Sequence, residues 1–112
     1  MCGIFALLNN IKTFEKEYIV TQFNKGQNRG PEYTTYKNFE HNVNLGFHRL
    51  AINGLDTLSQ QPITLYNYTL ICNGEIYNYK ELFKELNISA HTNSDCEIII
   101  HLYKRYGIKQ TM

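Results

Sequence analysis

The 112-residue sequence has no excess of charge of either sign, no long apolar run, few prolines and glycines, and only three cysteines. Eleven basic against ten acidic residues leave a formal net charge of +1, so charge gives no reason to expect a nucleic acid or a membrane surface as partner. No stretch approaches the roughly 20 apolar residues of a membrane span. With two prolines and seven glycines, no linker, low-complexity tract or internal repeat stands out, and the length suits one domain.

The number and spacing of the cysteines indicate the redox compartment of the protein. Cys2, Cys72 and Cys96 are an odd number without close pairing, which suits a reducing compartment. The apolar residues 1–10 are few and lack both a basic region and a small-residue cleavage site, so we expect no secretion signal and a cytoplasmic protein. A content of 43% hydrophobic and 13% aromatic residues is enough for a packed core and argues against disorder.

Hydrophobic spacing predicts strands first and helices later. The run 3–8 is expected to be a buried strand, and the strand 43–52 would place Leu45, Phe47, Arg49 and Ala51 on one face. The expected strands are 3–8, 34–39, 43–52 and 68–72, and the expected helices are 15–25, 78–86 and 94–106. This order favours an α+β fold over alternating βαβ units.

Local signals place the ends of these elements. Gly26 and Gly107 are expected to cap helix C-termini. Capping patterns, Asn78 with Glu81 and Ser94 with Glu97, mark the starts of the two later helices. Loops are expected at residues 28–31 and 53–62, and the Asn-Gly dipeptide at 73–74 is a turn that tolerates positive φ.

Cys2 is a candidate nucleophile once Met1 is removed. Removal would leave a thiol and a free α-amine on one residue, and the amine, with an ordinary pKa near ~8, can serve as the thiol's general base. Taken alone, a cysteine at position 2 could equally be a small apolar residue near the terminus with no catalytic role. The motifs elsewhere in the sequence favour the catalytic interpretation of Cys2.

Six short motifs occur in one order along the chain: Met1–Ala6, Asn28–Glu32, Leu45–Ile52, Gln60–Ile63, Cys72–Asn78 and Ser94–Tyr103. In order and approximate spacing they resemble the class II glutamine amidotransferases, a family of N-terminal-nucleophile hydrolases. Within it the chain is most similar to the asparagine synthetase branch, down to the ending Gly107–Thr111. The resemblance covers the whole chain, and although each motif alone is weak, six in order argue against chance.

The resemblance implies a fold and a reaction. The family fold is a four-layer αββα sandwich, and residues 1–112 would form only part of that domain, without its C-terminal part and without a synthetase domain. The implied reaction is hydrolysis of L-glutamine to glutamate and ammonia through a Cys2 thioester, with no cofactor. Ammonia would pass to a separate synthetase chain or be released, and the missing part of the domain could come from another chain.

Site residues follow by position. The family's oxyanion donors correspond to the Asn73 side chain and the Gly74 backbone N–H, its carboxylate-binding arginine to Arg49, and its ammonium-binding aspartate to Asp95. The implied catalytic residues are Cys2, Asn73 and Gly74. The implied glutamine-binding residues are Arg49, Leu50, Ala51, Ile52, Asn53, Asn73, Gly74, Glu75 and Asp95.

Simpler interpretations exist for each residue alone. An Asn-Gly pair is commonly a plain turn, Arg49 could form a surface ion pair, and Asp95 suits the first turn of a helix. The sequence also departs from the family at Glu32, where aspartate is usual. The chain could therefore be a non-catalytic remnant or interaction module of a truncated or split synthetase. A third possibility is amination of a sugar or phosphoribosyl acceptor, although the run 47–51 favours the asparagine branch.

The remaining candidates are weaker. His91, Cys96 and His101 lie five residues apart, which matches no common metal-ligand spacing, so no metal site is predicted. His48 is expected to be a hydrogen-bonded structural residue. Cys72 and Cys96 lie in apolar runs and are expected to be packed thiols.

Overall fold

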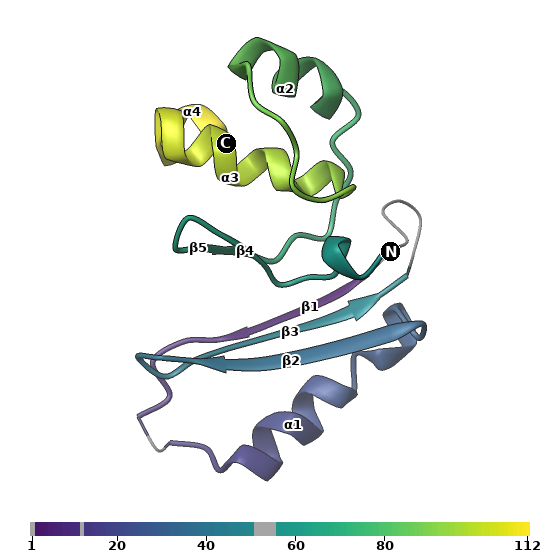
Figure 1. Ribbon diagram of the computed structural model, residues 1–112. Helices are drawn as coiled ribbons and strands as arrows, with labels where there is room; N and C mark the ends of the chain where they lie inside the picture. Colours follow the sequence, from purple (N-terminus) through teal and green to yellow (C-terminus); the bar gives the residue numbers. More distant parts are fainter. Residues whose placement is uncertain (1, 12, 51–55) are drawn as a thin grey trace. The chain divides into compact units, whose positions relative to one another are not determined.

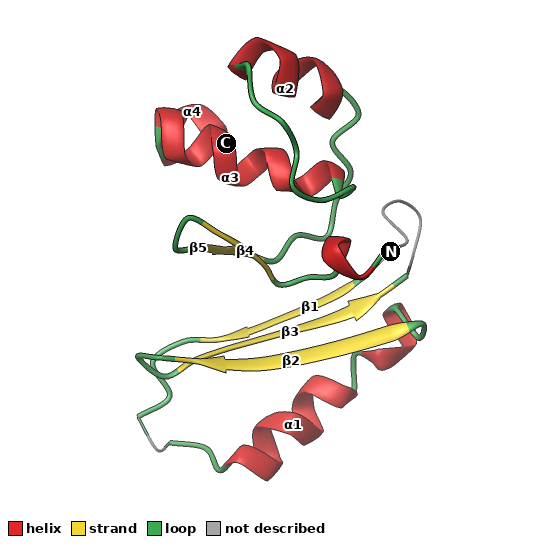
Figure 2. Ribbon diagram, viewed as in Figure 1, coloured by secondary structure: helices red, strands yellow, loops and turns green. Residues whose placement is uncertain are grey.

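The computed structural model describes residues 2–11, 13–50 and 56–112, and the chain divides into two compact units, Met1–Ala51 and Ile52–Met112. Helices and strands are mixed, as Figures 1 and 2 show, in agreement with the predicted α+β class. The αββα sandwich is a finer statement and stays a prediction. Within the described parts of the chain, no helix is both long enough and apolar enough to cross a membrane.

The first unit is a three-stranded antiparallel sheet with one helix on one face (Figure 1). Its strands are β1 (Gly3–Leu7), β2 (Tyr33–Phe39) and β3 (Val43–Arg49), in the order β1-β3-β2. Residues 40–42 join β2 to β3, and His41 and Asn42 among them both have φ of 60°, the left-handed conformation common in tight hairpin turns. β3 lies in the middle and is buried at nearly every position, whereas the edge strand β1 alternates between faces.

Helix α1 (Lys16–Asn24) packs on this sheet through Phe23, which is 3% exposed. A Cβ added to Gly46 of β3 would lie 2.4 Å from Cε2 of Phe23, so only glycine leaves room for the ring there. His48 stacks on the same ring, with centroids 4.1 Å apart. Its Nε2 donates to the Phe23 carbonyl over 2.9 Å and its Nδ1 contacts the Thr34 hydroxyl at 3.0 Å, which confirms His48 as a hydrogen-bonded structural residue.

The second unit combines a hairpin with three helices. Strands β4 (Ile63–Leu65) and β5 (Tyr68–Leu70) are joined by Tyr66 and Asn67, whose φ values of 52° and 68° again suit a two-residue turn. Helices α2 (Tyr79–Leu86), α3 (Ile98–Tyr106) and α4 (Ile108–Thr111) follow. α2 and α3 pack around Phe83, Leu86 and Ile98, the last of which has no exposed surface.

Several boundaries differ from the prediction. The first strand exists, but it is not buried throughout, since Ile4 is 51% exposed on an edge strand. Gly26 does not cap α1, because Lys25 does so and Gly26 has a φ of −82°. The expected loops contain short 3-10 helices, η1 (Gln27–Arg29) and η2 (Thr57–Ser59). The strand expected at 68–72 ends at Leu70, and its partner β4 was not predicted.

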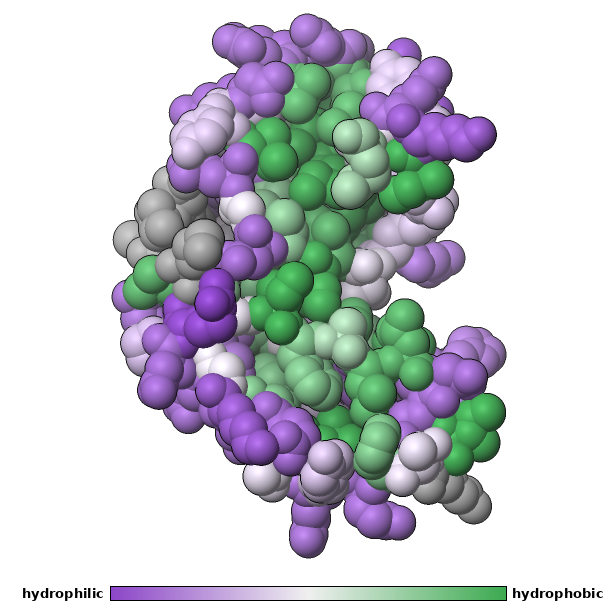
Figure 3. Space-filling view, turned by 180° about the vertical axis from the view of Figure 1, so that it is seen from behind, coloured by the Kyte–Doolittle hydropathy of each residue, from purple (hydrophilic) through white to green (hydrophobic). Residues whose placement is uncertain are grey.

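The two later helices begin and end close to the expected positions. α2 has Asn78 as N-cap and ends at Leu86, and α3 follows a 3-10 turn, η3 (Asp95–Glu97), and ends before Gly107. Gly107 has a φ of 73°, a conformation that glycine adopts without strain. Large hydrophobic side chains also reach the surface of each unit, as the green areas of Figure 3 show.

Candidate active site

The Cys2 sulfur contacts both polar backbone groups of Leu50. Sγ lies 3.4 Å from the Leu50 carbonyl oxygen and 3.4 Å from its nitrogen. The carbonyl can accept the thiol proton, and the N–H can donate to a thiolate, so both protonation states of the nucleophile have a partner. Cys2 is half-buried, which leaves part of it accessible to a small molecule.

Arg49 directly precedes the residue that the Cys2 sulfur contacts. β1 and β3 pair with Gly3 opposite His48, so one further step of the same register places Cys2 opposite Arg49. Side chains of directly opposed residues in an antiparallel pair emerge on the same face. Arg49 is 6% exposed and shares its face of β3 with Phe47, away from α1. Continued to residue 2, this register would put the predicted nucleophile and the predicted carboxylate-binding side chain on one face of the sheet.

The segment 28–32 holds the ends of these strands. Nε of Arg29 donates to the Cys2 carbonyl over 3.2 Å, and the Glu32 N–H donates to the Arg49 carbonyl over 3.2 Å. A Cβ on Gly30 would lie 2.2 Å from the His48 carbonyl oxygen, so the backbone approaches β3 there as only glycine allows. Glu32 thus belongs to a segment that is tied to Arg49 by its own N–H and to Cys2 by the side chain of Arg29.

In the second unit, Asp95 positions the segment that carries Asn73, Gly74 and Glu75. Oδ2 of Asp95, which is 7% exposed, accepts the Ile76 N–H over 2.6 Å. Asn73 is half-buried, and Gly74 and Glu75 are exposed. Neither Asn73 nor Gly74 uses the positive φ that their dipeptide tolerates. Four of the predicted site residues therefore form a second group around one hydrogen bond.

Gln61 anchors the other end of that segment. Its Nε2 donates to the Cys72 carbonyl over 3.0 Å, and its Oε1 accepts the Cys72 N–H. Gln61 is 6% exposed, so this pair of hydrogen bonds is protected from water. No role for Gln61 was predicted from the sequence. The only signal was its place in a matched motif, because a contact over 11 positions leaves no trace in local spacing.

The Cys72 and Cys96 thiols influence each other next to Gly74. The hydrogen bond from Cys96 lowers the pKa of Cys72 to about 7, against the opposing effects of burial and of the Asp95 charge. Donation to Cys72, burial and the nearby negative charges raise the pKa of Cys96. The Cys96 sulfur also lies 3.7 Å from the Gly74 carbonyl oxygen. Cys96 is packed as predicted, and Cys72 has the character of a reactive thiol.

Cys72 should therefore be alkylated at a lower pH than Cys96. Because the thiolate is the nucleophile, its iodoacetamide rate should rise through a midpoint near pH 7, while native Cys96 stays unmodified. Peptide mass spectrometry over a pH series measures both residues separately. Cys96→Ala removes the donor and should move the Cys72 midpoint upward. An unshifted midpoint at the ordinary value, about 8.5, in the original chain would contradict this account.

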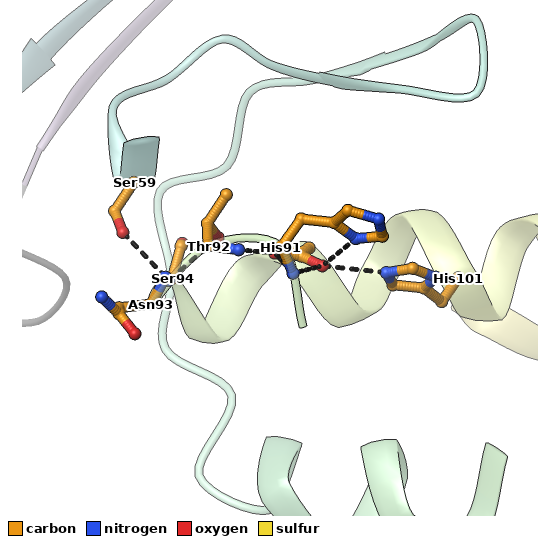
Figure 4. A network of polar contacts seen from close by, with 7 residues as sticks. Ser59, His91, Thr92, Asn93, Ser94 and His101 are labelled. Carbon is orange, nitrogen blue, oxygen red and sulfur yellow. Dashed lines mark hydrogen bonds and ion pairs between the residues drawn. The ribbon is translucent and has the colours of Figure 1, made fainter. Parts of the chain in front are cut away.

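A polar network fixes the residues just before Asp95 (Figure 4). Glu97 accepts from the backbone N–H groups of His91 at 2.9 Å and Thr92 at 2.6 Å, and from Nε2 of His101 at 3.0 Å. Burial raises the pKa of the Glu97 carboxyl, but these hydrogen bonds outweigh it and hold the pKa below its usual value. The helix-start pattern predicted a reach back to Ser94, whereas Glu97 reaches further, to His91 and Thr92.

Asp56 ties the same stretch to η2. It accepts from Asn93 at 2.8 Å and from the Ser59 N–H at 2.9 Å. The Asn93 side chain contributes most to lowering the pKa of Asp56 to about 2. The Ser59 hydroxyl in turn accepts the Asn93 N–H over 3.0 Å. Residues 91–95 are therefore held from two sides, which fixes the backbone that presents Asp95.

The predicted site thus falls into two groups, one in each unit. The first comprises Cys2, Arg49 and Leu50, and the second Asn73, Gly74, Glu75 and Asp95. Ala51, Ile52 and Asn53, the other predicted glutamine-binding residues, lie outside the described residues.

Comparison with known proteins identifies the family. The family model described as "Glutamine amidotransferase domain" matches residues 1–112. The chain is 40% identical to "Asparagine synthetase [glutamine-hydrolyzing]" of Mesocricetus auratus and 38% identical to the human protein of that name, over 100% of this chain and 20% of each relative. The protein of that name from Gallus gallus is 38% identical over 99% of the chain. The chain spans about one fifth of the length of these relatives. It belongs to the glutamine amidotransferase domain family.

Proposed function

We propose that this chain binds L-glutamine and hydrolyses its side-chain amide to glutamate and ammonia, as the glutaminase part of an asparagine synthetase-type system. The observation that carries the proposal is the contact of the Cys2 sulfur with both backbone groups of Leu50, one residue from Arg49. A nucleophile needs a partner for its proton, and an amino-acid substrate needs a cation for its carboxylate.

The first step forms a thioester. The free α-amine of Cys2 accepts the thiol proton, and Sγ attacks the amide carbon of glutamine. The oxygen becomes an oxyanion, which the Asn73 side-chain amide and the Gly74 N–H would stabilise as donors. The carbon–nitrogen bond then breaks, and the leaving nitrogen takes the proton back from the amine and departs as ammonia.

The second step consumes water. Water gives a proton to the amine and attacks the thioester carbon, and the carbon–sulfur bond breaks to release glutamate and restore the thiol. During both steps Arg49 would hold the substrate carboxylate with two parallel hydrogen bonds. Asp95 would receive the ammonium, and Glu75 directly precedes Ile76, whose N–H donates to Asp95. Backbone groups of residues 50–53 would line the pocket.

The test is glutamine hydrolysis by purified protein whose intact mass lacks Met1. We expect glutamate and ammonia in equal amounts. We also expect a glutamine analogue with an electrophilic ketone on its side chain to form one adduct, which peptide mass spectrometry places on Cys2. Glutamine binding without turnover would favour the non-catalytic interaction module. An adduct on Cys72 alone would remove Cys2 from the mechanism.

A further inference from the structure

Three side chains that the proposed reaction does not use converge at the start of α3 (Figure 4). They are His91, Glu97 and His101, whose nearest nitrogen and oxygen atoms all lie within 4.8 Å of one another. Nδ1 of His91 is 3.3 Å and Nε2 of His101 is 3.0 Å from the same carboxylate oxygen of Glu97. The two imidazole rings lie nearly parallel, with centroids 5.9 Å apart and an angle of 14°.

Two imidazole nitrogens and one carboxylate oxygen form a donor set typical of zinc. Zn²⁺ binds such atoms at about 2.0–2.1 Å in a tetrahedron, whose edges are then about 3.3–3.4 Å. The two nitrogen–oxygen distances, 3.0 Å and 3.3 Å, are close to such an edge. We propose that His91, Glu97 and His101 bind one zinc ion, with water as the fourth ligand.

The surroundings meet the other needs of such a site. The His91 side chain is 49% exposed, so the ion and its water can reach the cluster from solvent, whereas Glu97 and His101 are buried and held in place. The Thr92 N–H donates to the second carboxylate oxygen and the His91 N–H is shared between both oxygens, and these bonds orient the carboxylate, as outer hydrogen bonds commonly do for metal ligands. The hydrogen bonds also keep the carboxylate ionised, which ligation requires.

Ion binding has a defined proton balance. Each ring nitrogen now faces a carboxylate, which only accepts, so each carries a proton that it donates. Zinc takes the place of both protons at these nitrogens, and each proton moves by way of solvent to the other nitrogen of its own ring, so that His91 and His101 bind as neutral imidazoles. The sequence predicted no metal site, because His91, Cys96 and His101 match no common ligand spacing. In the structure the turn at 95–97 directs Glu97 to the histidines and Cys96 to Gly74.

The ion would join two separate pieces of the second unit. His91 lies in the loop after α2, and His101 lies four residues beyond Glu97 on α3. Tyr66 meets both imidazole rings edge-on, with centroids 5.9 Å and 5.7 Å away, and backs the cluster from the hairpin. Because the loop leads directly to Asp95, zinc would fix the approach to that residue without touching it.

The experiment uses the full chain, stripped of metal and titrated with zinc alone against a chromophoric chelator. We expect one zinc per chain and a higher melting temperature with zinc than with magnesium, which prefers oxygen ligands. His91→Asn should weaken zinc binding at least ~10-fold, the smallest effect usual for disturbing a metal site. His41→Asn, which removes an exposed imidazole from the first unit, should leave the affinity unchanged.

Two results would overturn the assignment. The first is equal zinc affinity in His91→Asn and the original chain, with both shown to be folded by circular dichroism. The second is an X-ray absorption spectrum with sulfur at about 2.3 Å, since that would place the ion on the cysteines. Zinc surrounded only by nitrogen and oxygen at about 2.0–2.1 Å would support the three residues named. None of these readouts depends on glutamine hydrolysis.

Discussion

Replacing Cys2 by alanine is expected to lower the rate of glutamine hydrolysis at least about 10³-fold while the first unit keeps its fold. The sulfur is the only atom of residue 2 that can form the thioester. Its contacts with Leu50 are weak sulfur hydrogen bonds at 3.4 Å, so their loss should change stability little. Initial rates of glutamate release, with glutamine affinity measured on the same samples, separate chemistry from binding.

A matched variant tests the α-amine. One residue added before Cys2, chosen so that it is not cleaved, leaves the thiol intact and converts the amine into an amide. Hydrolysis should then fall as far as in Cys2→Ala, although the thiol still reacts with iodoacetamide. If Cys2→Ala retained its rate, another nucleophile would be at work. If only the extended chain retained it, a base other than the amine would move the proton.

Replacing Glu97 by alanine is expected to destabilise the second unit by about 3–5 kcal/mol in metal-free solution. The carboxylate has no exposed surface and accepts from the backbone of His91 and Thr92 and from His101. Its removal leaves two part-buried N–H groups and the buried His101 imidazole without their acceptor. Since whole domains are stable by only about 5–15 kcal/mol, this loss could unfold much of the population at room temperature.

Urea unfolding with a chelator present measures the effect. Glu85→Ala removes an exposed carboxylate from α2 and should change the free energy of unfolding by less than about 0.5 kcal/mol. Glu97→Gln keeps an acceptor oxygen but not the charge, so it should fall between the two. A change below about 1 kcal/mol for Glu97→Ala would mean that water or another side chain replaces the carboxylate easily.

Elements with long, regular signals could be predicted from the sequence. Helix α2 combines an N-cap position with clear amphipathic spacing, and Gly107 marks the end of α3. Of the hairpin β4–β5, only β5 was predicted. The strand β4 gave no clear signal because Ile63–Leu65 is only three residues long and follows a polar loop. The hairpin turn uses Tyr66 at a positive φ, and tyrosine gives no hint of that conformation.

Only those site residues that lie in the family motifs could be predicted from the sequence. Cys2 and Leu50 are 48 residues apart, and no local pattern joins them; the resemblance to the family did. The hydrogen bonds of Gln61 to Cys72, and those of Glu97 to the loop before it, form only when the chain folds, so no local sequence pattern predicts them. A helix-start pattern correctly marked Glu97 as important to local structure, but the backbone donors to its carboxylate are His91 and Thr92 and not the expected Ser94.

The hydrogen bond from Ile76 to Asp95 links the order of a loop to the recognition of a substrate. One carboxylate orders the loop of Asn73 and, in the proposed reaction, recognises the substrate ammonium. Part of the entropy cost of arranging the oxyanion donors is then met during folding, before glutamine arrives. A mutation at Asp95 would therefore disturb affinity and transition-state stabilisation together. Evolution of a different substrate preference at this position would need a second change to restore the order of the loop.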